Sequence, residues 1–130
     1  MSQTLFGEGW TPALRNELER NTNNGRVGST LVSETDDLRV WQIKLEPGER
    51  LPFHRHVLNY FWTVLTDGEG RSHYGDGRIA EVQYKAGDTK HLVHGPGQSM
   101  IHDLENIVDT TLLFTTVEFL KSGNQPLPLA

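Results

Sequence analysis

Three histidines in two short stretches of the chain have the type and spacing of metal ligands. His54 and His56 are two positions apart, and residues i and i+2 of a strand point to the same face. His102 lies in a second stretch, in which positions 102, 104 and 106 share a face. If the sheet closes on itself, His102 can meet the first pair in the interior. We therefore expect His54, His56 and His102 to bind one divalent metal ion; neutral imidazole suits Fe, Ni, Cu and Zn.

The expected ligand set predicts the charge of the substrate. Three protein ligands leave coordination positions open for water, O2 or a chelating molecule. No acidic residue lies between His56 and Asp67, so a site made of these histidines alone keeps the full charge of a divalent ion. That charge favours anionic chelators such as enolates, β-dicarbonyls and hydroxy acids.

The remaining histidines are weaker candidates. His91 and His94 are three positions apart, so in a strand their side chains point to opposite faces. We interpret both as surface or rim residues. His73 stands beside a hairpin signal, and we expect it on the surface.

Two carboxylates and one amide lie on the strands that follow. Glu105 and Glu118 are alternatives for a carboxylate ligand, but Glu105 has the wrong parity relative to His102, and Glu118 is far along its strand. Asn106 is interpreted as a residue that braces the backbone.

The elements that must position these residues are short strands separated by turns. Thr11 can cap a short helix that has Pro12 at its first position. Beyond it, stretches rich in aromatic and β-branched residues alternate with turns containing Gly, Pro and Asp, which is typical of an all-β sandwich or barrel. The expected strands cover residues 38–45, 60–66, 71–74, 78–84, 99–106 and 110–120.

Length and composition exclude several classes of function. The 130 residues suffice for one domain with one core. The absence of cysteine excludes disulfides, thiolate catalysis and Cys-ligated zinc. A net charge of −5 with scattered Lys and Arg argues against nucleic-acid and anionic-membrane partners. The apolar runs are too short to cross a bilayer, and no secretory leader is evident, so we expect a cytoplasmic protein.

The two histidine stretches resemble the two motifs of the cupin superfamily, G-x5-H-x-H-x3,4-E-x6-G and G-x5-P-x-G-x2-H-x3-N. Three residues match the first motif at its spacing, and three match the ends of the second: Gly48, His54 and His56, then Gly87, His102 and Asn106. The resemblance implies a double-stranded β-helix, the cupin jelly-roll barrel, with a short N-terminal helix. It implies a single domain over residues 1–130 with its barrel at about 38–120, a metal in the interior, and a homodimer.

The sequence departs from the cupin pattern at two places. The second motif carries four extra residues, since Gly87 and His102 are 15 positions apart against 11 in the family. In the first motif, Tyr60 stands where the family has its glutamate ligand. Tyr60 shares strand parity with His54 and His56, which leaves three roles open for it: phenolate ligand, hydrogen-bond donor to substrate or O2, or core residue. We favour the donor, which makes Tyr60 the catalytic candidate.

The ligand pattern resembles that of one group of cupin enzymes. A three-histidine site without the glutamate is similar to acetylacetone dioxygenase and related thiol dioxygenases, which use Fe(II). The chief hypothesis is therefore an Fe(II) dioxygenase that acts on a small chelating anion. Lyase or isomerase chemistry with Zn, Mn or Ni is one alternative, and a non-catalytic barrel that binds a small molecule is another.

Overall fold

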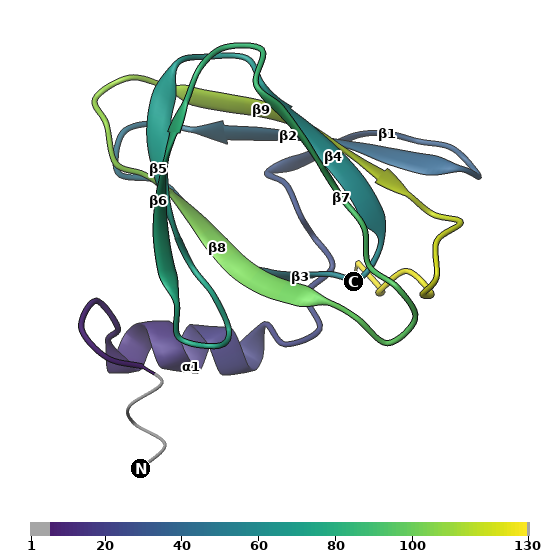
Figure 1. Cartoon of the computed structure of the whole chain (residues 1–130), viewed down its shortest axis with the longest axis horizontal. Helices are drawn as coiled ribbons and strands as arrows, with labels where there is room; N and C mark the ends of the chain where they lie inside the picture. The colour runs from purple at the N-terminus through teal and green to yellow at the C-terminus, as the bar shows by residue number, and fades with distance from the viewer. Residues whose placement is uncertain (1–5, 130) are drawn as a thin grey trace.

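The structure, a computed structural model, describes residues 6–129 of the chain. Two antiparallel sheets face each other and form a barrel (Figure 1). Sheet A has the order β1-β2-β9-β4-β7, and sheet B has the order β3-β8-β5-β6. The strands are β1 Thr30–Glu34, β2 Leu38–Leu45, β3 Arg50–His56, β4 Asn59–Val64, β5 Gly68–His73, β6 Ile79–Tyr84, β7 Thr89–Leu92, β8 Met100–Asn106 and β9 Leu112–Phe119. The all-β prediction is confirmed.

The predicted N-terminal helix is also present. Helix α1 covers Pro12–Arg20 and lies against the outside of the barrel, below β3 and β8 in Figure 1. The Thr11 hydroxyl accepts a hydrogen bond from the Leu14 amide at 3.1 Å, so Thr11 is the N-cap and Pro12 opens the helix. Asn21 ends the helix, and its backbone amide donates to the carbonyl oxygen of Glu17. In residues 6–129, no helix is long and apolar enough to cross a membrane.

Two strands, β1 and β7, were not predicted from the sequence. Both are edge strands of sheet A, and most of their residues are exposed. A strand that pairs on one side and is exposed on both faces needs no alternation of apolar and polar residues. The hydrophobic pattern therefore could not reveal either of them.

A β-bulge in β3 shapes the half of the barrel that contains His54, His56 and His102. Leu51 pairs with Leu104, and His54 pairs with His102. Between these two pairs β3 therefore advances by three residues while β8 advances by two. The extra residue brings Leu51 and His54 to the same face of sheet B, the interior. The apolar core fills the neighbouring part of the interior; its buried members are Ile43, Leu45, Leu51, Val64, Tyr84, Leu104, Leu112 and Phe114.

Candidate metal centre

The structure brings His54, His56 and His102 together inside the barrel. One potential ligand atom from each of the three residues lies within 4.8 Å of the others. The Nε2 atoms of His56 and His102 are 3.2 Å apart. Imidazole nitrogens bound to one ion at about 2.0–2.1 Å lie roughly 3 Å apart in tetrahedral geometry. The spacing of these two nitrogens therefore fits a shared metal ion.

The tautomer of His54 also fits metal binding. His54 Nδ1 lies 2.8 Å from the carbonyl oxygen of Pro52. A carbonyl oxygen can only accept, so Nδ1 carries the proton and Nε2 keeps its lone pair. Ligating histidines are commonly oriented by such a hydrogen bond from the second ring nitrogen.

The three rings are held neutral, which is the form that binds metals. His54 and His56 are both 2% exposed. Burial lowers the pKa of His54 to about 4. Burial, followed by the neighbouring histidines, lowers the pKa of His56 and of His102 well below the ordinary value. At neutral pH, the site therefore offers ligands that need not lose a proton.

No carboxylate joins the histidines in the part of the chain that the structure describes. Glu105 faces away from the interior and pairs with Arg71 at 3.4 Å, as its strand parity predicts. Glu118 is buried, but its Oε1 accepts a hydrogen bond from the Trp41 indole at 2.7 Å. The centre is thus a set of three imidazoles with no carboxylate among its candidate ligands.

Tyr60 lies against the candidate ligands. Its ring stacks on that of His56, with centroids 4.0 Å apart and planes 9° apart. It is 3% exposed and lines the same cavity as the three histidines. Burial, followed by Tyr74 and Glu118, raises the pKa of Tyr60. The site therefore holds a neutral phenol, which can donate a hydrogen bond.

The histidines face a cavity of about 230 Å³. This is smaller than the usual pocket for a drug-sized molecule. None of its lining residues is acidic, and two, Arg78 and Lys90, are basic. Lys90 lies on β7 and Val82 on β6, the edge strands of the two sheets, and both are exposed. The sequence did not reveal either basic residue, because Arg78 lies in the turn before β6 and Lys90 lies on a short edge strand without hydrophobic alternation.

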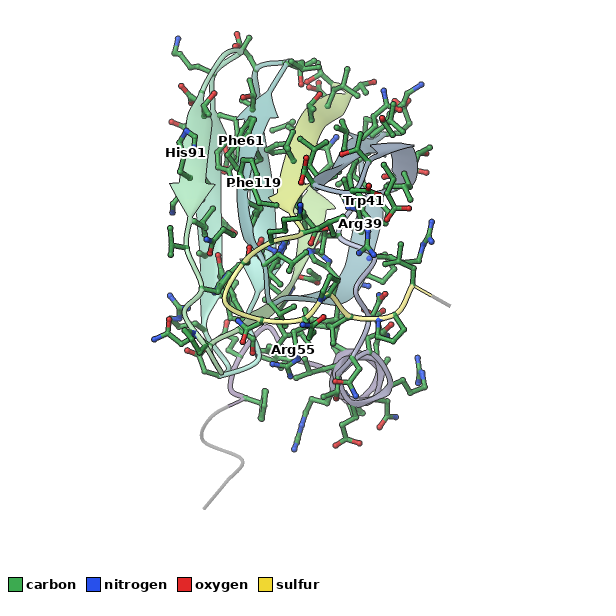
Figure 2. The ribbon with its side chains drawn as sticks, turned by 90° about the vertical axis from the view of Figure 1, so that its right-hand side faces the viewer. Arg39, Trp41, Arg55, Phe61, His91 and Phe119 are labelled. Carbon is green, nitrogen blue, oxygen red and sulfur yellow. The ribbon has the colours of Figure 1, made fainter. Side chains whose placement is uncertain are left out.

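The other histidines are outside this centre. His91 lies on the outer face of sheet A, where its ring packs on Phe61 beside Phe119 (Figure 2). His94 is half-buried beyond the end of β7, with its ring 6.1 Å from that of Tyr60. Both agree with the interpretation as surface and rim residues.

The prediction that His73 lies on the surface is wrong. His73 is 4% exposed, because Trp10 packs on its ring and the carbonyl oxygen of Gly9 lies 3.3 Å from its Nε2. Its amide and its Nδ1 donate to the carboxylate of Asp103 at 2.6 and 3.1 Å, and its ring packs on Trp10. The hairpin signal predicts where a strand ends, but it carries no information about a distant segment that covers the strand.

Asn106 has the bracing role that its position predicts. Its side-chain amide donates to the carbonyl oxygens of Leu45 and Thr110, and its Oδ1 accepts from the Val108 amide. These bonds close the turn between β8 and β9. They also fix the end of the strand that carries His102.

Comparison with known proteins supports the fold. No protein-family model matches the chain, and no curated protein matches it. A Klebsiella pneumoniae protein with a double-stranded β-helix domain is 29% identical, with a TM-score of 0.58 over 78% of this chain and 81% of that one. A cupin domain from Bordetella pertussis is 21% identical, with a TM-score of 0.61 over 69% and 88%. An RmlC-like cupin from Methanocaldococcus jannaschii is 21% identical, with a TM-score of 0.53 over 72% and 84%. The chain thus has the cupin fold that the sequence predicts.

Proposed function

We propose that this protein is a metal-dependent enzyme that acts on a small chelating anion, with an Fe(II) dioxygenase reaction as the favoured class. His54, His56 and His102 are the proposed ligands. The observation that carries the proposal is the convergence of three neutral imidazoles inside the barrel, with no carboxylate among the candidate ligands. A divalent ion held there would keep its charge, polarise a chelated substrate and, as iron, make O2 chemistry accessible.

The charges around the cavity support an anionic substrate. Arg78 and Lys90 are the charged residues of the lining, in a protein whose net charge is −5. The Arg78 guanidinium lies 4.4 Å from the centre of the Tyr74 ring, and the Tyr74 ring lies 5.4 Å from that of His102. An anion that enters the cavity would therefore meet positive charge before it reaches the proposed metal ion.

Two features of Tyr60 support its proposed role as a hydrogen-bond donor to bound substrate or O2. The stack on His56 fixes the direction of its ring, and its raised pKa keeps the proton on the phenol oxygen. We therefore propose that Tyr60 positions the bound molecule by a hydrogen bond and is not a phenolate ligand. We further propose that the protein is cytoplasmic and forms a homodimer.

Metal analysis combined with an oxygen electrode tests the proposal. Tag-free protein supplied with Fe, Zn, Ni and Mn should carry about one divalent ion per chain. Iron-loaded protein should consume O2 with some member of a panel of β-dicarbonyls, thiols and hydroxy acids. Turnover that continues unchanged without oxygen would move the assignment to a Zn, Mn or Ni lyase or isomerase. A metal content near zero would favour a non-catalytic binding barrel.

A further inference from the structure

We propose that helix α1 supports the candidate metal centre from outside the barrel, and that Glu17 is a positioning residue for His54. Glu17 holds the β3 bulge in the conformation in which Pro52 accepts the proton of His54 Nδ1. This inference rests on the proposed function in one respect, namely that His54 is a metal ligand.

The bulge depends on the N-terminal segment for its hydrogen bonds. Pro52 and Phe53 fall between the paired residues Leu51 and His54, so they have no partner in the register of β8. Pro52 has no amide proton to donate. The Phe53 amide donates to Glu17 Oε2 at 3.0 Å, and the Phe53 carbonyl accepts from Asn24 Nδ2 at 2.9 Å. Both polar groups of the Phe53 backbone are thus bound by residues outside the sheets.

Glu17 is itself held firmly. Its two carboxylate oxygens accept from Nη1 and Nη2 of Arg50, each at 3.0 Å. The same guanidinium donates to Asp103 at 2.7 Å, and Asp103 is fully buried next to His102. Burial opposes the charge of Glu17, but the bonds from Arg50 and Phe53 outweigh it and lower the pKa of the carboxyl. An ionised Glu17 therefore links α1 to both strands that carry the histidines.

Aromatic packing keeps the helix segment in place over the bulge. Trp10 stacks on Phe53, with ring centroids 5.7 Å apart and planes 12° apart, and Phe53 is fully buried. Phe53 points outward to Trp10 while its neighbour His54 points inward to the cavity. The peptide unit between Pro52 and Phe53 is therefore fixed from outside the barrel. Its orientation decides where the Pro52 carbonyl lies inside the barrel.

Loss of Glu17 would leave the Phe53 amide buried without an acceptor. The bulge would relax, and His54 would no longer be restricted to the tautomer that frees Nε2. Groups that orient a metal ligand in this way typically contribute about 10- to 100-fold to metal affinity. Glu17 should thus affect metal binding although it lies outside the cavity.

Two measurements on Glu17→Ala test the inference. The dissociation constant for zinc is measured by competition with a chromophoric chelator, and the His54 tautomer of the metal-free protein by ¹⁵N NMR. Glu17→Ala should bind zinc roughly 10- to 100-fold more weakly, with His54 shared between its two neutral tautomers. Glu17→Gln, whose amide oxygen can still accept from Phe53, should recover part of the affinity. Glu19→Ala, an exposed position on the same helix, should match the wild type.

Several results would overturn the inference. One is a Glu17→Ala protein that melts at a lower temperature but keeps its zinc affinity and its His54 tautomer, because Glu17 would then only stabilise the fold. If Glu17→Ala does not fold, Glu17→Asp takes its place, because its side chain is one methylene too short to keep both the Arg50 pair and the bond from the Phe53 amide. Unchanged zinc affinity and tautomer in that variant would equally overturn the inference. Wild-type protein that binds no zinc or other divalent ion would overturn the proposed function instead, while the NMR comparison would still decide the role of Glu17.

Discussion

The ring of Tyr60 lies flat on the ring of His56, with centroids 4.0 Å apart and planes 9° apart. His56 ends β3 in sheet B and Tyr60 belongs to β4 in sheet A, so the stack joins the two sheets beside the candidate metal centre. It also combines a ligand candidate with a phenol that burial keeps neutral. The packing of Tyr60 on His56 can therefore be separated from its proposed role as a hydrogen-bond donor by removing only its hydroxyl group.

Tyr60→Phe should keep the metal and lose affinity for the substrate. Phenylalanine preserves the stack on His56, so zinc affinity should stay within about twofold of the wild type. The lost hydrogen bond should weaken a bound substrate analogue by about 1 kcal/mol, roughly fivefold. Chelator competition and calorimetry measure the two quantities. Metal loss comparable to that of His54→Ala would instead identify Tyr60 as a ligand.

Removing one proposed ligand should abolish tight metal binding. His54→Ala and His102→Ala each leave two imidazoles, and two ligands rarely hold a divalent ion. We expect metal content to fall from about one ion per chain to near zero, as measured by elemental analysis. His91→Ala is the matched control, since His91 lies on the outer face of sheet A. Full metal content in either ligand variant would contradict the proposed site.

The local pattern of the sequence was sufficient to predict that His54 and His56 point to the same face of their strand. Their spacing of two predicts a shared face, and both point into the barrel. His102 needed the family resemblance, because only the pairing of β3 with β8 within sheet B sets it beside His54, and local patterns do not predict which strands pair. The bulge between Leu51 and His54 was not predicted, although Pro52 within the strand is a residue typical of bulges and edge strands.

The burial and the hydrogen-bond partners of some residues could not be predicted, because they depend on contacts with segments distant in sequence. His73 is buried by a segment that includes Gly9, 64 positions away. The sequence alone predicts that Glu17 is an ordinary solvent-facing helix residue. In the structure, its carboxylate accepts hydrogen bonds from the Arg50 guanidinium and the Phe53 amide. Periodicity reports which face of an element is apolar, and it does not report which other element covers that face.

The basic residues of the cavity should control the affinity for anions. Lys90→Gln removes one charge from the lining and keeps most of the side chain. We expect a hydroxy-acid probe to bind roughly two- to fivefold more weakly to the metal-loaded variant at low salt, with the difference fading at high salt. Lys44→Gln, an exposed position on β2, is the control. Equal affinities of the two variants would argue against an anionic substrate.

The protein should form a homodimer. Strand β6 is an edge strand of sheet B, and its Ile79 and Val82 are exposed at 36% and 42%. Unpaired edges with apolar side chains favour association. Light scattering should give twice the chain mass of 14.7 kDa. A monomer at every working concentration would refute this prediction.

Glu118 should make the stability of the fold depend on pH. It is 3% exposed, its Oε1 accepts from Trp41, and Arg39 and Tyr60 are its cross-strand neighbours on either side. Burial raises the pKa of Glu118 from 4.5 to about 7, although the Trp41 bond and the charge of Arg39 oppose the shift. The folded chain thus keeps a proton on Glu118 at pH values where the unfolded chain has released it.

The sign of the pH effect follows from this difference in proton binding. Between pH 4.5 and about 7, the folded state binds more protons at Glu118 than the unfolded state, so the contribution of this residue lowers the free energy of unfolding as pH rises. Glu118→Gln cannot ionise, and its amide oxygen can still accept from Trp41. The variant should therefore gain stability relative to the wild type across this interval, by up to about 3 kcal/mol at pH 8. Urea unfolding of both proteins at pH 5, 6, 7 and 8 measures the difference, with Glu19→Gln on the exposed face of α1 as the control. A difference that stays constant with pH would show that Glu118 ionises like an exposed glutamate.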